Sequence, residues 1–233
     1  MNLRSLTLLT LLAVIPVAAA AETVRIEADR DATLIEDPDG ARANGSGPAV
    51  FVGRTSQAQN GIRRALLYFD VAPALPRNAI IESATLQLFH SGGNSGMREI
   101  RVHRVLADWG EGPASASGGG GAPSETGDAT WLHTVYDYDF WVHSGGQFVG
   151  RVSARQEVGP DGFYNWDGTE HLVQDVRMWH RAPRRNFGWI LIGDETTRQN
   201  AKRFASRENP DATIRPLLEI TYSVPGGGRA RPR

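Results

Sequence analysis

The chain has 233 residues, of which 40% are hydrophobic and 22% are charged, so its composition is that of a foldable domain and excludes a disordered acidic chain. Its 25 basic and 26 acidic residues leave a formal net charge of −1, which argues against a dedicated nucleic-acid-binding protein because such proteins carry a clear basic excess. The absence of cysteine excludes thiol catalysis, cysteinyl zinc sites and iron–sulfur clusters.

Residues 1–21 have the pattern of a secretory signal peptide. Arg4 precedes an apolar run over residues 6–17, and four small residues follow at 18–21, as signal peptidase requires. An uncleaved N-terminal anchor is the alternative, although the run is short for a bilayer and no second apolar stretch follows it. We therefore expect a secreted, periplasmic or cell-surface protein with no transmembrane segment after cleavage and one domain over residues 22–224.

Short alternating segments occupy most of the remaining chain. In residues 24–28 every second position is apolar, as in a half-buried strand. Residues 63–71 are largely apolar on both faces, which indicates a central strand. Further segments of this kind lie at 84–89, 100–106, 187–193 and 217–222, and turn residues separate them at 38–40, 44–45, 60–61, 73–78 and 92–96.

Apolar side chains recur every three to four residues over 170–181, which predicts the one helix. Asp167 or Thr169 can cap its start, and Pro183 ends it. Trp179 lies on the apolar stripe, so we expect it in the core. Many strands with one short helix indicate an all-β sandwich rather than alternating βαβ units.

Two glycine-rich segments are expected to be irregular. Residues 114–126 contain four consecutive glycines but lack the Gly-Lys-Ser/Thr ending of a phosphate-binding loop, which excludes that kind of nucleotide site. Residues 225–233, with three glycines and three arginines, are expected to form a disordered tail. Because an exported chain without cysteine has no disulfides, its hydrophobic core, a bound cation such as Ca²⁺, or both must stabilise the fold.

Four groups of motifs follow one another along the chain. They are residues 63–70 (RRALLYFD) with 80–88 (IIESATLQL), 108–112 (DWGEG) with 127–131 (GDATW), 187–195 (FGWILIGDE), and 204–208 (FASRE) with 215–222 (RPLLEITY). Together they resemble the DNRLRE domain family of secreted bacterial and archaeal proteins over most of residues 22–224. The segment 133–168 departs from that pattern because it is longer than the link in simpler members.

The resemblance implies a jelly-roll-like antiparallel β-sandwich. Some related domains act as carbohydrate-binding modules for acidic polysaccharides such as alginate, and others are parts of cell surfaces or matrices. The resemblance does not imply catalysis, because a shared fold does not fix function.

The basic residues are almost all arginine, with 24 arginines against the single Lys202. Four arginines lie on or beside predicted strands: Arg63, Arg64, Arg203 and Arg207. A guanidinium group binds a carboxylate through two parallel hydrogen bonds, so these residues are candidates for binding uronate groups. The alternative is an internal network with Asp70, Asp194 or Glu208, because a buried arginine requires local partners.

Four tryptophans lie outside the periodic pattern or in the long loop region: Trp109, Trp131, Trp141 and Trp166. If their rings are exposed, they form a platform on which sugar rings stack through apolar contact. If they are buried, they pack the loops onto the sandwich. The sequence leaves the two interpretations open and favours packing for Trp131.

The candidate cation site is a local group of acidic and imidazole side chains: Asp137, Asp139 and His143. Asp37 and Asp39, beside the turn at Gly40, offer a second set of oxygen donors for calcium, but the spacing of an EF-hand loop is absent. A solvated turn is the alternative for both. The sequence therefore establishes no cofactor and leaves calcium as one option, with Asp137, Asp139 and His143 as its candidate ligands.

No catalytic signature stands out. Asp194 and Glu195 are adjacent carboxylates, but alternation points their side chains apart if they lie in a strand, and a Gly-x-Ser-x-Gly elbow is absent. We therefore expect a non-catalytic module that binds polysaccharide, including uronate-containing polysaccharide, or other envelope components, and not nucleic acid. A structural or adhesive envelope protein with protein partners is one alternative, and a polysaccharide lyase or hydrolase is the other.

Overall fold

The computed structural model describes residues 20–93 and 96–225. The predicted signal peptide lies outside this part of the chain except for Ala20 and Ala21, and the predicted tail lies outside it except for Pro225. Within the described ranges, no helix is both long enough and apolar enough to cross a membrane.

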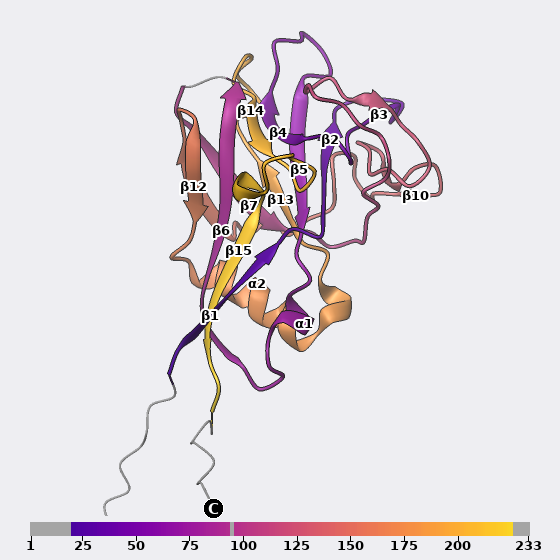
Figure 1. The fold of residues 1–233 in the computed structure, drawn as a ribbon. Helices are drawn as coiled ribbons and strands as arrows, with labels where there is room; N and C mark the ends of the chain where they lie inside the picture. Colours follow the sequence, from indigo (N-terminus) through magenta and orange to yellow (C-terminus); the bar gives the residue numbers. More distant parts are fainter. Residues whose placement is uncertain (1–19, 94–95, 226–233) are drawn as a thin grey trace, which may run out of the picture.

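Two antiparallel sheets form the body of the molecule (Figure 1). The first contains β1 (Glu22–Glu27), β15 (Leu217–Ser223), β6 (Ile80–Gly93), β12 (Gly162–Trp166), β14 (Lys202–Ala205) and the start of β4 (Ala49–Arg54). The second contains the end of β4, β2 (Arg30–Ile35), β5 (Ile62–Tyr68), β13 (Trp189–Ile192), β7 (Arg98–Arg104) and β11 (Ala154–Val158). Because β4 pairs with β14 and then with β5, the two sheets are one large sheet curled on itself. The predicted all-β, jelly-roll-like antiparallel sandwich is confirmed in this form.

Six strands coincide with alternating segments of the sequence: β1, β5, β6, β7, β13 and β15. In β5, Ala65 and Leu67 are buried on the inner face and Leu66 on the outer face, which is why both faces of this segment are apolar. Leu106 lies beyond the end of β7 and is exposed, so the alternation predicted there stops earlier. Two further pairs of short strands lie in the loops: β3 (Arg42–Ala43) with β8 (Ala122–Pro123), and β9 (His133–Val135) with β10 (Asp139–Phe140).

Helix α2 (Glu170–Arg181) has the predicted bounds and lies at the lower end of the sandwich in Figure 1. Thr169, rather than Asp167, caps it, because its hydroxyl oxygen accepts a hydrogen bond from the Leu172 N–H at 3.2 Å. Pro183 begins a short 3₁₀ turn after the helix ends. A four-residue helix, α1 (Val71–Ala74), packs against α2 and is an addition to the one helix that the sequence predicts.

Asp175 joins α2 to the strands around it. Its carboxylate is buried and accepts hydrogen bonds from Ser153 Oγ at 2.5 Å and from Trp189 Nε1 at 3.0 Å. The guanidinium groups of Arg104 and Arg151 lie 3.2 and 3.5 Å from its other oxygen. This single carboxylate therefore bonds to side chains from three separate segments of the chain.

The main core lies between the inner faces of the two sheets and α2. Its largest fully buried side chains include Trp166, Trp179, Trp189 and Phe204. The rings of Trp179 and Trp189 lie with their centroids 4.4 Å apart, so Trp179 is a core residue as the helical spacing predicts. Each buried ring removes about 150–250 Å² from water, which corresponds to about 4–6 kcal/mol of transfer free energy.

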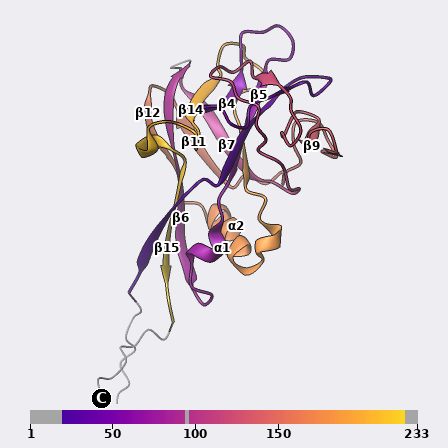
Figure 2. The same cartoon turned by 45° about the vertical axis from the view of Figure 1, so that its right-hand side comes forward.

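A second core covers the outer face of the second sheet. The connection between β7 and β11 lies on the side of β5 that faces away from β6, as Figures 1 and 2 show. Side chains of this connection pack onto the outward residues of β2, β5 and β13. The cluster includes Ala32, Leu34, Leu66, Ile190 and Ile192 from the strands, and Val105, Trp109, Trp131 and Trp141 from the connection.

Two histidines in the strands of the first and second sheets are buried: His90 in β6 and His103 in β7. Burial lowers the pKa of His90, and the charge of Lys202 adds to this effect, although a nearby carbonyl and carboxylate oppose it. Burial also lowers the pKa of His103, whose Nδ1 lies 3.0 Å from the Val149 carbonyl oxygen. Both rings are therefore harder to protonate in the folded protein than in the unfolded chain.

This difference makes the contribution of the two histidines to stability fall on acidification, whereas the buried carboxylates with a raised pKa contribute in the opposite direction. Histidine in the unfolded chain has a pKa of about 6.5, so below that pH the unfolded chain binds more protons than the folded protein. We expect the histidine contribution to the free energy of unfolding to decrease from about pH 7 to 5, by up to about 1.4 kcal/mol per pH unit for each histidine. Urea denaturation at pH values across this range measures the free energy of unfolding, with EGTA present to remove any bound calcium. The slope of stability against pH should change in His103→Gln and not in the exposed His143→Asn; identical profiles for His103→Gln and the unmodified protein would contradict the expectation.

Candidate functional site

The four candidate tryptophans are buried. Trp109, Trp131, Trp141 and Trp166 are only 1%, 9%, 5% and 0% exposed. Three of the indole N–H groups donate to backbone carbonyl oxygens at 2.9 Å, those of Phe187, Thr130 and Ile100, in the order Trp109, Trp141 and Trp166. A buried ring cannot stack on a sugar, so of the two interpretations that the sequence leaves open, packing describes these four residues and the candidate binding role is wrong for them.

Arg63 is also buried, and it bonds within the protein. It donates to the carbonyl oxygens of Asn60 at 2.8 Å, of Ile62 at 2.7 Å and of Gly119, and to Gln57 Oε1 at 3.1 Å. Burial lowers its pKa to about 10. The contact with Gly119 holds the glycine-rich loop against β5, so Arg63 has a structural role rather than the predicted role in binding uronate.

Arg64 and Arg203 are likewise bonded to other residues of the chain. Arg64 donates to the two carboxylate oxygens of Glu195 at 2.7 and 3.0 Å, and its guanidinium group lies 4.9 Å from the centroid of the Trp131 ring. Arg203 Nη1 donates to the Ser91 carbonyl oxygen at 3.1 Å and hydroxyl oxygen at 2.5 Å. The internal-network alternative therefore describes both arginines, although Arg64 pairs with Glu195 rather than Asp194 and Arg203 bonds to Ser91 rather than to a carboxylate.

The structure does not gather the predicted cation group. Asp137, Asp139 and His143 lie on and after the hairpin of β9 and β10, where their side chains are exposed, and they do not form a group of donors close enough to share an ion. Asp37 accepts a hydrogen bond from the Asp39 N–H at 2.9 Å, as expected of a turn residue.

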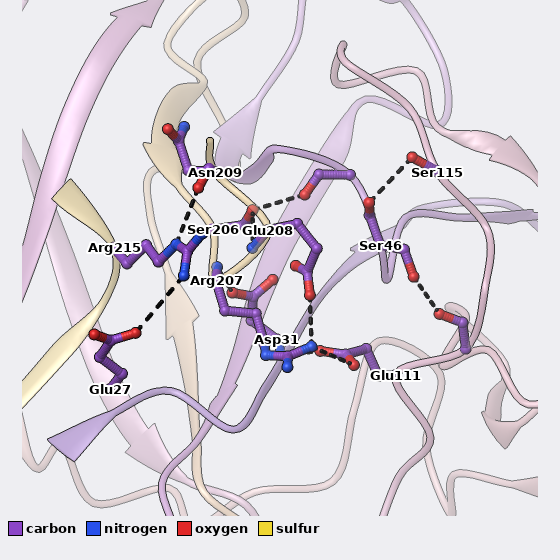
Figure 3. Close-up of polar contacts among 12 residues, drawn as sticks. Glu27, Asp31, Ser46, Glu111, Ser115, Ser206, Arg207, Glu208, Asn209 and Arg215 are labelled. Carbon is purple, nitrogen blue, oxygen red and sulfur yellow. Dashed lines mark hydrogen bonds and ion pairs between the residues drawn. The ribbon is translucent and has the colours of Figure 1, made fainter. Parts of the chain in front are cut away.

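A different group of carboxylates lies close together (Figure 3). Asp31 is the second residue of β2, Glu111 lies in the connection after β7, and Glu208 lies in the turn after β14. One oxygen of each carboxylate lies within 4.8 Å of the others. We call Asp31, Glu111, Glu208 and the adjoining Arg207 the acidic cluster.

Glycines on both sides fix the direction of Glu111. A Cβ atom on Gly110 would lie 1.9 Å from the Gly127 carbonyl oxygen. Gly112 has φ of +69°, and a Cβ atom on it would lie 2.0 Å from Asp128 Oδ1. Only glycine fits these positions, so the close approach of two loop segments directs the Glu111 side chain toward β2.

Side-chain hydrogen bonds hold the turn that carries Glu208. Ser206 Oγ donates to the Gly47 carbonyl oxygen at 2.7 Å and accepts from the Glu208 N–H at 3.2 Å. Asn209 Nδ2 donates to the Pro48 carbonyl oxygen at 3.0 Å. These bonds tie the turn to the segment before β4 and fix the backbone on either side of Arg207 and Glu208.

Hydrogen bonds within the acidic cluster satisfy only some of its oxygens. The Arg207 N–H donates to Asp31 Oδ2 at 2.6 Å, and the Asp31 N–H donates to Glu111 Oε1 at 2.8 Å. Arg207 Nη1 lies 3.1 Å from Glu111 Oε2 and 2.6 Å from Glu208 Oε1. Asp31 Oδ1 and Glu208 Oε2 are buried without a hydrogen-bond partner.

The charges of the acidic cluster do not balance. Three carboxylates face the guanidinium group of Arg207, and the charge of Arg30 also acts on Glu111. Burial raises the pKa of Asp31 well above its usual range, and the neighbouring Glu208 and Glu111 add to this, against the hydrogen bond and charge of Arg207. Burial also raises the pKa of Glu111 and of Glu208. A positive charge supplied from outside the chain would therefore be stabilised here.

The outer face of the first sheet carries a second constellation. Alternate residues of β12, β6, β15 and β1 form this face, which we call the outer sheet face (Figure 1). Phe163 is 51% exposed, and its ring lies edge-on to Phe89 with the centroids 4.9 Å apart. Beside them, Gln87 Nε2 donates to Asn165 Oδ1 at 3.0 Å. An aromatic ring and two amide groups thus lie together on an exposed surface.

A hollow of about 340 Å³ adjoins these side chains. Arg25 and Glu219 form an ion pair of 2.8 Å at its edge. Seven residues line it, including one arginine and two carboxylates: Arg25, Thr85, Gln87, Asn165, Asp167, Leu217 and Glu219. The hollow is therefore polar, with hydrogen-bond donors and acceptors but no excess of positive charge.

The hairpin of β9 and β10 exposes apolar side chains. Tyr138, Phe140 and Val142 occupy alternate positions and are 63–70% exposed. Large apolar side chains that gather at one exposed place mark surfaces for contact with other molecules.

Comparison with known proteins assigns no function to the acidic cluster or to the outer sheet face. No family model matches the chain, and no curated protein matches it. Membership of the DNRLRE family therefore stays a prediction from the ordered motifs. Glu111 lies in the second of these motif groups, and Glu208 lies in the fourth.

Sequence reasoning did not propose five residues of the acidic cluster and the outer sheet face as site residues: Asp31, Gln87, Glu111, Phe163 and Asn165. Of these, Asp31, Phe163 and Asn165 lie outside the four groups of motifs. Asp31 precedes the apolar run 32–35, which does not alternate and so gives no strand signal. The available signal was the position of Asp31 directly before this run, because a carboxylate there is expected to be buried, and a buried charge requires partners. Phe163 lies two residues before Asn165 in a strand that exposes both side chains, a spacing that the sequence does show.

Proposed function

We propose that this chain is an exported, non-catalytic module that binds polysaccharide through the outer sheet face. The exposed Phe163 beside the amide pair of Gln87 and Asn165 carries this proposal. A sugar ring has an apolar face and a rim of hydroxyl groups. On the outer sheet face, the aromatic ring can pack against the apolar face of the sugar and the amide groups can hydrogen-bond to its hydroxyl groups. Export rests on the signal-peptide pattern of residues 1–21.

The charge of the outer sheet face favours neutral sugars. Of the four arginines that the sequence proposes for uronate binding, Arg63, Arg64 and Arg207 bond to residues that do not belong to the outer sheet face. The fourth, Arg203, bonds to Ser91 near the end of β6. The hollow itself contains Asp167 and Glu219 against the single Arg25. Uronate carboxylates would meet net negative charge there, so a neutral glycan is the ligand class that we propose.

Calorimetry and affinity electrophoresis against neutral glycans, alginate and pectin test this proposal. We expect binding to at least one neutral glycan and about tenfold weaker binding by Phe163→Ala, equivalent to about 1.4 kcal/mol. Asn165→Ala should weaken binding in the same way. Both side chains are exposed, so neither substitution opens a cavity in the core.

The matched control is the double variant Tyr138→Ser/Phe140→Ser, which removes exposed aromatic rings from the hairpin and leaves the outer sheet face intact. Unchanged binding by this variant supports the proposal. An absence of binding to any glycan would overturn polysaccharide binding, and a preference for alginate or pectin would overturn the neutral class. Loss of binding in the hairpin variant alone would move the site away from the outer sheet face.

The second candidate is a structural or adhesive role with protein partners, and the hairpin favours it. Tyr138, Phe140 and Val142 form an apolar surface without the amide groups that recognise sugars. In this case the protein retains envelope proteins in a pull-down that added glycan does not disturb. The same double hairpin variant abolishes that retention, whereas Phe163→Ala leaves it unchanged.

A further inference from the structure

Two buried oxygen atoms in the acidic cluster have no hydrogen-bond partner. Asp31 is 1% exposed, and its Oδ1 is unpaired, as is Glu208 Oε2. An unpaired buried carboxylate oxygen costs free energy comparable to or greater than that of a lost hydrogen bond. Figure 3 shows the side chains of Asp31, Glu111 and Arg207 directed toward one another. The structure thus combines a shortage of hydrogen-bond donors with an excess of negative charge.

The spacing of the carboxylates suits one shared ion. Oxygen ligands lie about 2.3–2.6 Å from calcium, so two ligands of the same ion are at most about 5 Å apart. The three carboxylates each offer an oxygen within 4.8 Å of the others. Arg207 contacts Glu208 through Oε1, which leaves Oε2 of the same carboxylate available without breaking that bond.

We infer that Asp31, Glu111 and Glu208 bind a calcium ion, with Asp31 Oδ1 and Glu208 Oε2 as two of its ligands. Oxygen ligands are those that calcium prefers, and three carboxylates supply both the ligands and the compensating charge. Magnesium is a poorer match, because it keeps several of its water molecules and Asp31 is too buried to accommodate them.

The ion links three segments that are far apart in the sequence. Asp31 lies in β2, Glu111 in the loop connection after β7, and Glu208 in the turn after β14. Binding to the folded form alone stabilises that form by mass action. Calcium therefore cross-links distant segments and stabilises the fold, as disulfides do in many exported domains, in a chain that has no cysteine.

Calorimetric titration and thermal unfolding of EGTA-treated protein test this inference. We expect a saturable calcium-binding heat and, at about 100-fold excess of calcium over Kd, a rise in Tm of about 5–10 °C. Asp31→Asn removes one ligand charge and should abolish both responses. It should fold at least as well as the unmodified protein in EGTA, because its amide N–H group can donate to Glu208 Oε2. Glu208→Gln is the second variant, and it should weaken calcium binding at least tenfold.

The control is Asp137→Asn/Asp139→Asn, which removes two exposed carboxylates from the hairpin and leaves the acidic cluster intact. An unchanged calcium response in this variant supports the assignment. The inference is overturned if calcium gives neither heat nor a shift in Tm, or if Asp31→Asn and Glu208→Gln keep the full response. A magnesium response equal to that of calcium would overturn the choice of ion.

Discussion

Asp175→Ala is expected to lower the free energy of unfolding by about 3–5 kcal/mol. The substitution removes a buried carboxylate that accepts from Ser153 Oγ and Trp189 Nε1 and that faces Arg104. The indole N–H and the guanidinium group are then left without this acceptor in a region of little water, and that loss exceeds the energy of any one contact. Urea denaturation at pH 7 measures the change.

Gln174→Ala is the matched control on the same helix, because Gln174 is exposed and bonds only near the surface. We expect it to change stability by less than about 0.5 kcal/mol. Asp175→Asn keeps an acceptor for Trp189 but not the charge, so its effect should fall between the two. If Asp175→Ala cost less than about 1 kcal/mol, the proposed role of this carboxylate in joining α2 to the strands would be wrong.

Trp109→Ala is the second large effect, with an expected loss of about 3–5 kcal/mol. The ring is buried in the second core, its N–H donates to the Phe187 carbonyl oxygen, and the Arg30 guanidinium group lies 4.8 Å from its centroid. Its removal leaves a cavity beneath the loop connection. Limited proteolysis should cut within 106–121 faster than in the unmodified protein, because the loop loses its main apolar contact with the sheet.

Two substitutions separate this effect from a general loss of stability. Leu106→Ala changes an exposed apolar side chain at the start of the same connection and should have little effect on either measurement. Trp109→Phe keeps much of the ring volume but loses the N–H group, so it should lose less stability than alanine. Unchanged proteolysis in Trp109→Ala would show that other contacts hold the loop.

Three of the strands that the sequence predicts have one face toward the core and the other toward the surface. β1, β6 and β15 alternate because one side of each lies on the core and the other on the surface. β2 and β4 escaped prediction because five of the six residues in each are buried, so buried and exposed positions do not alternate along them. Their burial is set by the loops and strands that pack on them, which local periodicity does not report.

The same distinction explains the outcome for the site residues. The internal bonding of Arg64 was foreseeable as an alternative, since a buried guanidinium group requires partners, but the choice of Glu195 depends on how β5 and the turn after β13 approach each other. The burial of Trp109 and Trp141 depends on the connection after β7 folding back over the second sheet. The acidic cluster forms only because β2, the connection after β7 and the turn after β14 pack against one another. The sequence contains its residues but does not show that they are close in space.

The sharing of β4 between the two sheets has a consequence for how the molecule unfolds. Residues 49–52 of β4 bond to β14, and Gly53 and Arg54 continue the same strand onto β5. Neither sheet can separate from the core without breaking a strand that also belongs to the other, and both contribute side chains to the main core. We therefore expect the sandwich to unfold as a single cooperative unit, because loss of one sheet removes the hydrogen-bond partners that β4 provides to the other.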